Sequence, residues 1–80
     1  MTIEKALECY EKAKREGKLT RKRKVSKYIP YNEGIILLPV PDAVPVLGEV
    51  WYYVRSDGRI SEVPVAVFAS KVDFDDAKTI

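Results

Sequence analysis

Apolar residues recur at three- and four-residue steps near the N-terminus, the spacing that places them on one face of an α-helix. The apolar positions are Ile3, Ala6, Leu7, Tyr10 and Ala13. Thr2 is a residue type that caps the start of helices, and Gly17 is one that ends them. The pattern therefore predicts an amphipathic helix between Thr2 and Gly17, held mainly by burial of its apolar stripe.

The pattern changes after the first third of the chain. Gly34 precedes a short apolar run at 35–38, which ends at Pro39. A run of this length predicts a β-strand, and because proline cannot donate to a sheet ladder, we expect the strand to lie near an edge. Residues 39–46 contain three prolines and are predicted to be an extended connector.

The segment from Gly48 to about Ala69 predicts a β-hairpin. Asp57-Gly58 suits a two-residue turn, which would pair residues whose numbers sum to 115. One face of this hairpin would be almost wholly apolar and is predicted to be core: Val50, Tyr52, Val54, Val63 and Val65. The other face would mix aromatic and charged side chains: Glu49, Trp51, Tyr53, Arg55, Ile60, Glu62, Pro64 and Ala66.

The C-terminal residues 73–76 are acidic apart from one phenylalanine. We expect residues 73–80 to form a mobile acidic tail, although its carboxylates could instead fold back onto cationic residues of the same chain. Residues 1–72 are predicted to form a single α+β domain, in which one N-terminal helix packs on a small, mainly antiparallel sheet of three or four strands.

Composition limits the classes of protein to which the chain can belong. Of the 80 residues, 46% are hydrophobic and 32% charged, which is typical of a soluble globular domain. No apolar run is long enough to span a membrane, and no signal peptide is recognisable, so a cytoplasmic location without a membrane partner is expected. The absence of glutamine and histidine, with many lysines and glutamates, is typical of hyperthermophile proteins and favours a thermophilic, archaeal or archaeal-virus source.

The residues of catalytic and metal sites are scarce. Cys9 is the single cysteine and histidine is absent, so neither an internal disulfide nor a zinc site built by this chain is expected. Without histidine, the usual general base near neutral pH is missing. The four glycines stand apart from one another, which excludes a glycine-rich phosphate loop. We expect no enzymatic activity, no metal and no cofactor.

Positive charge is concentrated in residues 12–27, which contain nine cationic residues and one acid. The overlapping segment 18–28 is predicted to be an exposed loop or the polar start of a strand in which Val25 points inward. Such a cluster can bind phosphates and release condensed counterions, although a solvated surface loop is the alternative. The candidate phosphate-binding residues are Lys18, Arg21, Lys22, Arg23, Lys24 and Lys27.

Trp51 and Tyr53 lie two residues apart on one strand face, and Arg55 follows them. Flat rings next to a cation are the features on which the bases of single-stranded nucleic acids stack, so these three residues are further candidates for nucleic-acid binding. The alternative is that Trp51 anchors the core under the N-terminal helix.

These patterns lead to two hypotheses. The first is a small, non-catalytic accessory protein that binds DNA or RNA through the phosphate backbone. The second is a protein-interaction module or homodimer subunit of a larger viral or nucleoprotein assembly. In the second hypothesis, another chain would cover the mixed face of the hairpin or complete the strand at 35–38.

Overall fold

The computed structural model describes residues 1–20, 23–39 and 49–80. Five antiparallel strands form one sheet in the order β4-β3-β2-β1-β5, and helix α1 packs on it, so the predicted α+β class and N-terminal helix are confirmed. The elements are α1 (Ile3–Arg15), β1 (Val25–Tyr31), β2 (Gly34–Pro39), β3 (Val50–Val54), β4 (Ile60–Pro64), α2 (Val65–Ala69), the 3-10 helix η1 (Phe74–Asp76) and β5 (Lys78–Thr79). None of the helices in the described ranges is long and apolar enough to cross a lipid bilayer.

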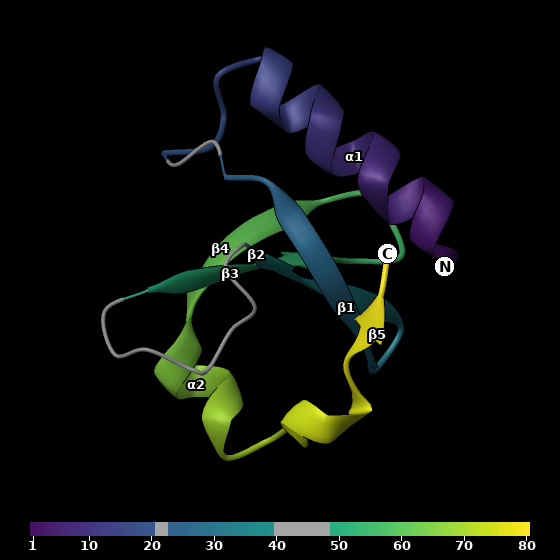
Figure 1. Cartoon of the computed structure of the whole chain (residues 1–80). Helices are drawn as coiled ribbons and strands as arrows, with labels where there is room; N and C mark the ends of the chain where they lie inside the picture. Colours follow the sequence, from purple (N-terminus) through teal and green to yellow (C-terminus); the bar gives the residue numbers. More distant parts are fainter. Residues whose placement is uncertain (21–22, 40–48) are drawn as a thin grey trace.

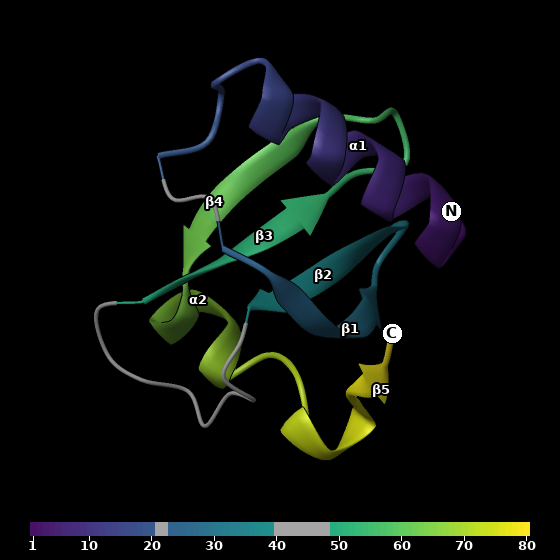
Figure 2. The ribbon, with the colours of Figure 1, turned by 45° about the horizontal axis from the view of Figure 1, so that its top comes forward.

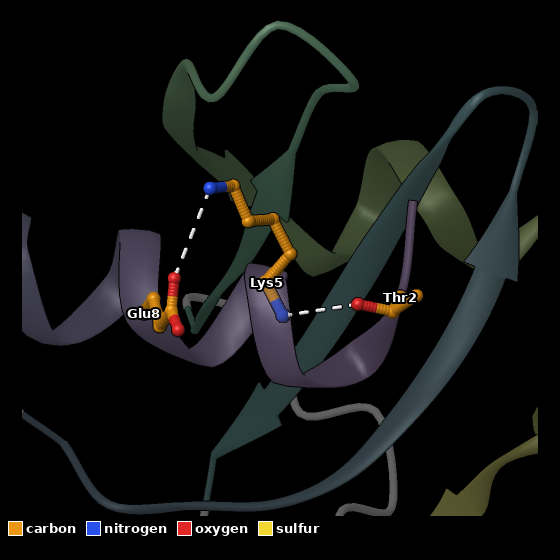
Figure 3. Close-up of polar contacts among 3 residues, drawn as sticks. All are labelled: Thr2, Lys5 and Glu8. Carbon is orange, nitrogen blue, oxygen red and sulfur yellow. Dashed lines mark hydrogen bonds and ion pairs between the residues drawn. The ribbon is translucent and has the colours of Figure 1, made fainter.

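Helix α1 has the boundaries that its sequence predicts. The hydroxyl oxygen of Thr2 accepts a hydrogen bond from the backbone N–H of Lys5 at 3.2 Å, and the Lys5 ammonium lies 3.9 Å from the carboxylate of Glu8 (Figure 3). The helix ends at Arg15, and Gly17 follows with a φ of 71°, a left-handed conformation that glycine adopts without strain.

Both faces of the sheet are covered (Figures 1 and 2). The face under α1 buries Tyr52 and Val54 of β3 with the apolar stripe of the helix. The opposite face buries Trp51 with Phe68 of α2, and Phe74 of η1 packs against this second cluster. Because each strand alternates its side chains between the two faces, β2 is buried at all six positions.

The hairpin formed by β3 and β4 has a different register from the one expected. Tyr52 pairs with Glu62, so paired residue numbers sum to 114 and not to 115. The backbone N–H of Arg55 donates to the carbonyl of Arg59 at 2.8 Å, and that of Gly58 donates to the carbonyl of Arg55 at 2.9 Å. Gly58 has a φ of 90°. This geometry is that of a three-residue connection with glycine in the left-handed position.

The shifted register changes the neighbours of several side chains. Glu62 now shares the α1 face with Tyr52, whereas the sequence placed it beside Trp51. Strand β4 also ends earlier than expected, at Pro64, and the chain continues into α2. The backbone N–H of Val65 still donates to the carbonyl of Glu49 at 3.0 Å, so the helix begins at the last hydrogen bond of the hairpin.

Strand β2 is central and not near an edge, which corrects the expectation based on its prolines. It pairs with β1 on one side and β3 on the other, and Pro39 is its last residue. The proline therefore marks the end of the strand. The connector predicted at 39–46 lies outside the described residues from position 40 onward.

The C-terminal segment, which the sequence analysis expected to be a mobile acidic tail, pairs with the sheet. β5 pairs with β1 through Lys27 and Tyr28, and the backbone N–H of Ile80 donates to the carbonyl of Ser26 at 3.1 Å. The alternative expectation, that the segment folds back on the basic part of the chain, describes its position. The contacts are backbone pairing and the ring of Phe74, whose centroid lies 5.9 Å from the Lys27 ammonium.

Candidate nucleic-acid interface

The chain between α1 and β1 is attached to the β3–β4 hairpin at several points. Leu19 is buried in the core under α1. The carboxylate of Glu62 accepts two hydrogen bonds from Thr20, one from the backbone N–H and one from the hydroxyl, both at 2.8 Å. Further along, the guanidinium of Arg23 lies 3.3 Å from the carboxylate of Glu49. These contacts fix the chain on both sides of positions 21 and 22.

Two buried tyrosines, Tyr10 and Tyr52, lie next to this attached segment. The hydroxyl of Tyr10 donates to the backbone carbonyl of Arg23, and its ring meets that of Tyr52 edge-on with centroids 4.9 Å apart. Burial raises the pKa of both tyrosines, and for Tyr52 the nearby carboxylate of Glu62 adds to this effect. The Tyr10 hydroxyl therefore stays protonated and remains a hydrogen-bond donor throughout the physiological pH range.

A cleft of about 650 Å³, here called the basic cleft, lies between the second half of α1 and the β3–β4 turn. It is lined by Cys9, Lys12, Ala13, Glu16, Lys18, Arg55, Asp57, Gly58, Arg59, Ile60 and Ser61. Four of these residues are cationic and two are acidic, so the lining has a net positive charge. Lys12 and Lys18 are far from Arg55 and Arg59 in the sequence, so the sequence alone does not show that all four line one cleft.

Two ion pairs partly neutralise the basic cleft. The ammonium of Lys18 lies 3.3 Å from the carboxylate of Glu16, and the guanidinium of Arg59 lies 3.4 Å from that of Asp57. All four side chains are exposed, and exposed pairs of this kind contribute little free energy. A phosphate can therefore compete with these carboxylates at small cost.

The basic residues predicted from the sequence have different environments. Lys18 and Arg55 line the basic cleft, and Lys24 is exposed. Arg23 is half-buried and paired with Glu49, and Lys27 lies against Phe74, so these two side chains are engaged within the fold. Arg21 and Lys22 lie outside the described residues.

The sequence analysis did not select Lys12 or Arg59 as site residues. Lys12 belongs to the cationic run, but the helical pattern alone did not show which element its side chain would face. Arg59 follows the Asp57-Gly58 turn, and a correct hairpin register would have placed it opposite Arg55. The signal that could have identified Arg59 is its positive charge in a turn that faces the C-terminal half of α1.

Trp51 does not form an exposed platform for bases. Its side chain is 1% exposed and stacks on Phe68 with ring centroids 6.1 Å apart, so a base cannot reach it in this structure. The alternative interpretation, a core anchor, describes its position, but α2 and η1 cover it in place of the N-terminal helix. Of the surfaces suggested for a protein partner, the part around Trp51 is covered by these elements, and β2 is paired on both sides within the chain.

Tyr53 has a different position, since it lines a second cleft. This cleft, here called the tyrosine cleft, measures about 460 Å³ and lies where the β1–β2 turn meets the β3–β4 turn. Its lining is Asn32, Glu33, Tyr53, Arg55, Ser56 and Asp57. The hydroxyl of Tyr53 donates to the carbonyl of Tyr31 at 3.3 Å, which holds the half-buried ring in place.

Among the described residues, no group of three or more cysteine or acidic side chains is arranged to hold a metal ion. No protein-family model matches the chain, and no curated protein or solved structure is significantly similar to it. The candidate interface is therefore defined by its own geometry: a net positive cleft whose cations come from α1, the segment that follows it, and the β3–β4 turn.

Proposed function

We propose that this protein is a small, non-catalytic nucleic-acid-binding accessory protein that contacts the phosphate backbone through the basic cleft. The observation that carries the proposal is the convergence of Lys12 and Lys18 from one segment with Arg55 and Arg59 from another around a single cleft. Arginine contributes two-pronged contacts to phosphate oxygens, and lysine contributes a flexible point charge. Lys24 is exposed but does not line the basic cleft.

The affinity expected from such a site depends strongly on salt. Each phosphate neutralised on duplex DNA releases condensed counterions and adds about 0.9 to the slope of log affinity against log salt concentration. If all four cations of the basic cleft contact phosphates, affinity should fall about 100-fold between 50 and 200 mM salt. Binding that releases no counterions would show an affinity that hardly changes with salt concentration.

Fluorescence anisotropy with labelled DNA and RNA, single- and double-stranded, tests the proposal at these two salt concentrations. We expect salt-sensitive binding by the wild type and at least a tenfold loss in a Lys12→Ala, Arg55→Ala double variant. The matched control is Lys71→Ala with Lys78→Ala, which removes two exposed cations from the C-terminal segment. The proposal is refuted if the wild type binds no polymer at 50 mM salt, or if both double variants lose the same affinity.

A further inference from the structure

The basic cleft and the tyrosine cleft lie at the β3–β4 turn and share two lining residues, Arg55 and Asp57. Arg55 is the last residue before the β3–β4 turn, and its backbone is held by hydrogen bonds to Arg59 and Gly58. The two clefts therefore have one arginine at their junction and different surroundings on either side. Because the surroundings differ, the two clefts should bind different chemical groups.

We propose that the two clefts together bind single-stranded nucleic acid, with a backbone phosphate in the basic cleft and an unpaired base in the tyrosine cleft. This inference rests on the proposed function and specifies its substrate class. Arg55 would contact the phosphate at the junction, where its planar guanidinium is also suited to lie against a base. The volumes of about 650 and 460 Å³ are in the range of ligand sites in proteins.

Charge distinguishes the contents of the two clefts. The basic cleft has four cationic and two acidic lining residues, whereas the tyrosine cleft has only Arg55 against Glu33 and Asp57. Two carboxylates repel a phosphate but not a neutral base. A nucleotide with one negative end and one neutral end is therefore oriented by this gradient, and the opposite orientation brings like charges together.

The side chains of the tyrosine cleft match the chemistry of a base. The ring of Tyr53 offers an aromatic surface, and stacking on aromatic side chains is how proteins hold bases that have left a helix. The amide of Asn32 both donates and accepts hydrogen bonds, and the carboxylate of Glu33 accepts them from amino groups. In a duplex these base edges are already paired, so the arrangement selects single strands.

The walls of the tyrosine cleft are also rigid, which lowers the entropy lost on binding. Asn32 has a φ of 52°, a left-handed conformation that asparagine tolerates, and it sets the tight β1–β2 turn. The ring of Tyr53 is held by its hydrogen bond to Tyr31 and by an edge-on contact with that residue's ring, with centroids 5.8 Å apart. Both turns are therefore formed before a ligand arrives.

The decisive experiment compares three probes at 50 mM salt: a 12-nucleotide oligodeoxycytidine, a strand of the same length and charge whose sugars carry no bases, and a 12-base-pair duplex. We expect the oligodeoxycytidine to bind about tenfold more tightly than the abasic strand, the gain typical of one stacked base. It should also bind more tightly than the duplex. Because these comparisons change only the probe, they do not depend on the stability of any variant.

Two variants locate the contact. Tyr53→Phe keeps the ring and should retain the preference for the strand with bases, whereas Tyr53→Leu should reduce binding to the abasic level without changing the abasic affinity. Equal, salt-sensitive affinities of the wild type for the two single strands would overturn the base site and leave the basic cleft intact. Absence of binding to all three probes would overturn the proposed function itself.

Discussion

The contacts that attach the chain between α1 and β1 to the fold predict how the hydroxyl group of Tyr10 contributes to the stability of the protein. This side chain is 1% exposed, and its hydroxyl donates to the carbonyl of Arg23. Tyr10→Phe keeps the ring and its edge-on contact with Tyr52, but it removes the donor. The Arg23 carbonyl then loses the hydrogen bond from Tyr10, just before the chain enters β1.

The magnitude follows from the net contribution of one intramolecular hydrogen bond to stability, about 0.5–1.5 kcal/mol. Because the Tyr10 side chain is buried, water does not replace the lost bond, and we expect the upper part of this range, about 1–1.5 kcal/mol. For a domain of this size each kcal/mol lowers the Tm by about 4–8 °C, so the variant should melt about 4–12 °C below the wild type. The matched control is Tyr28→Phe, since the Tyr28 hydroxyl has no hydrogen bond within the described part of the chain.

Tyr10 and Tyr52 also predict how the free energy of unfolding depends on pH in alkaline solution. Burial raises the pKa of Tyr10 and Tyr52 above the unfolded value of about 10, so above that pH the folded state holds protons that the unfolded state has lost. Their contribution to stability is complete below about pH 10 and is lost as the pH rises above it. For Tyr10, whose pKa is raised far above 10, the loss is about 1.4 kcal/mol per pH unit. Urea unfolding between pH 8 and 11 measures this slope.

In Tyr10→Phe one of the two titrations is removed, so stability should fall less steeply above pH 10 than in the wild type, by about 1.4 kcal/mol per pH unit. Lysine deprotonation is common to both proteins and cancels in the difference. The reasoning is refuted if the two slopes coincide, or if Tyr10→Phe is as stable at pH 7 as the Tyr28→Phe control.

Further predictions concern packing at a glycine and at the C-terminal segment. At Gly34 a Cβ atom would lie 2.2 Å from the Val54 carbonyl oxygen, so Gly34→Ala should cost about 3 kcal/mol or more in urea unfolding. Gly17→Ala, where the φ is 71° but the space is open, should cost only about 1–2 kcal/mol, and equal costs would contradict the close approach. Phe74→Ala should uncover Trp51, seen as a red shift of its emission and stronger acrylamide quenching, and unchanged quenching would show that η1 does not cover the ring.

The sequence predicted those elements that are specified by periodicity over several residues. The stripe of α1 and the apolar run of β2 are of this kind, and both were located correctly. The hairpin register was missed because Asp57-Gly58 fits both a two-residue and a three-residue connection, and the choice depends on the packing of both strands. β5 was missed because a strand of two residues has no periodicity to detect.

The location of the candidate site follows from the way this short chain buries its sheet. α1 covers one face, and α2 with η1 covers the other, so neither broad face is available among the described residues. The hydrogen bonds from Arg55 to Arg59 and from Val65 to Glu49 place the outward backbone groups of β4 at positions 60, 62 and 64. Pro64 has no N–H to offer there, and a second β4 paired through Glu62 would bring two carboxylates together, which disfavours edge pairing.

The turn end of the sheet is thus where this fold leaves concave surface, and both clefts lie there. Side chains in turns are weakly constrained by packing, so their charges can be set by binding with little cost to stability. Lys12 and Lys18 near the C-terminal end of α1 also lie where the helix dipole favours cations, and the fold tolerates them there without further partners. The segments that carry the positive charge of the basic cleft are therefore also parts of the fold. The positions of Arg55 and Arg59 follow from the length of the β3–β4 turn, which is the feature of the hairpin that could not be predicted from its sequence.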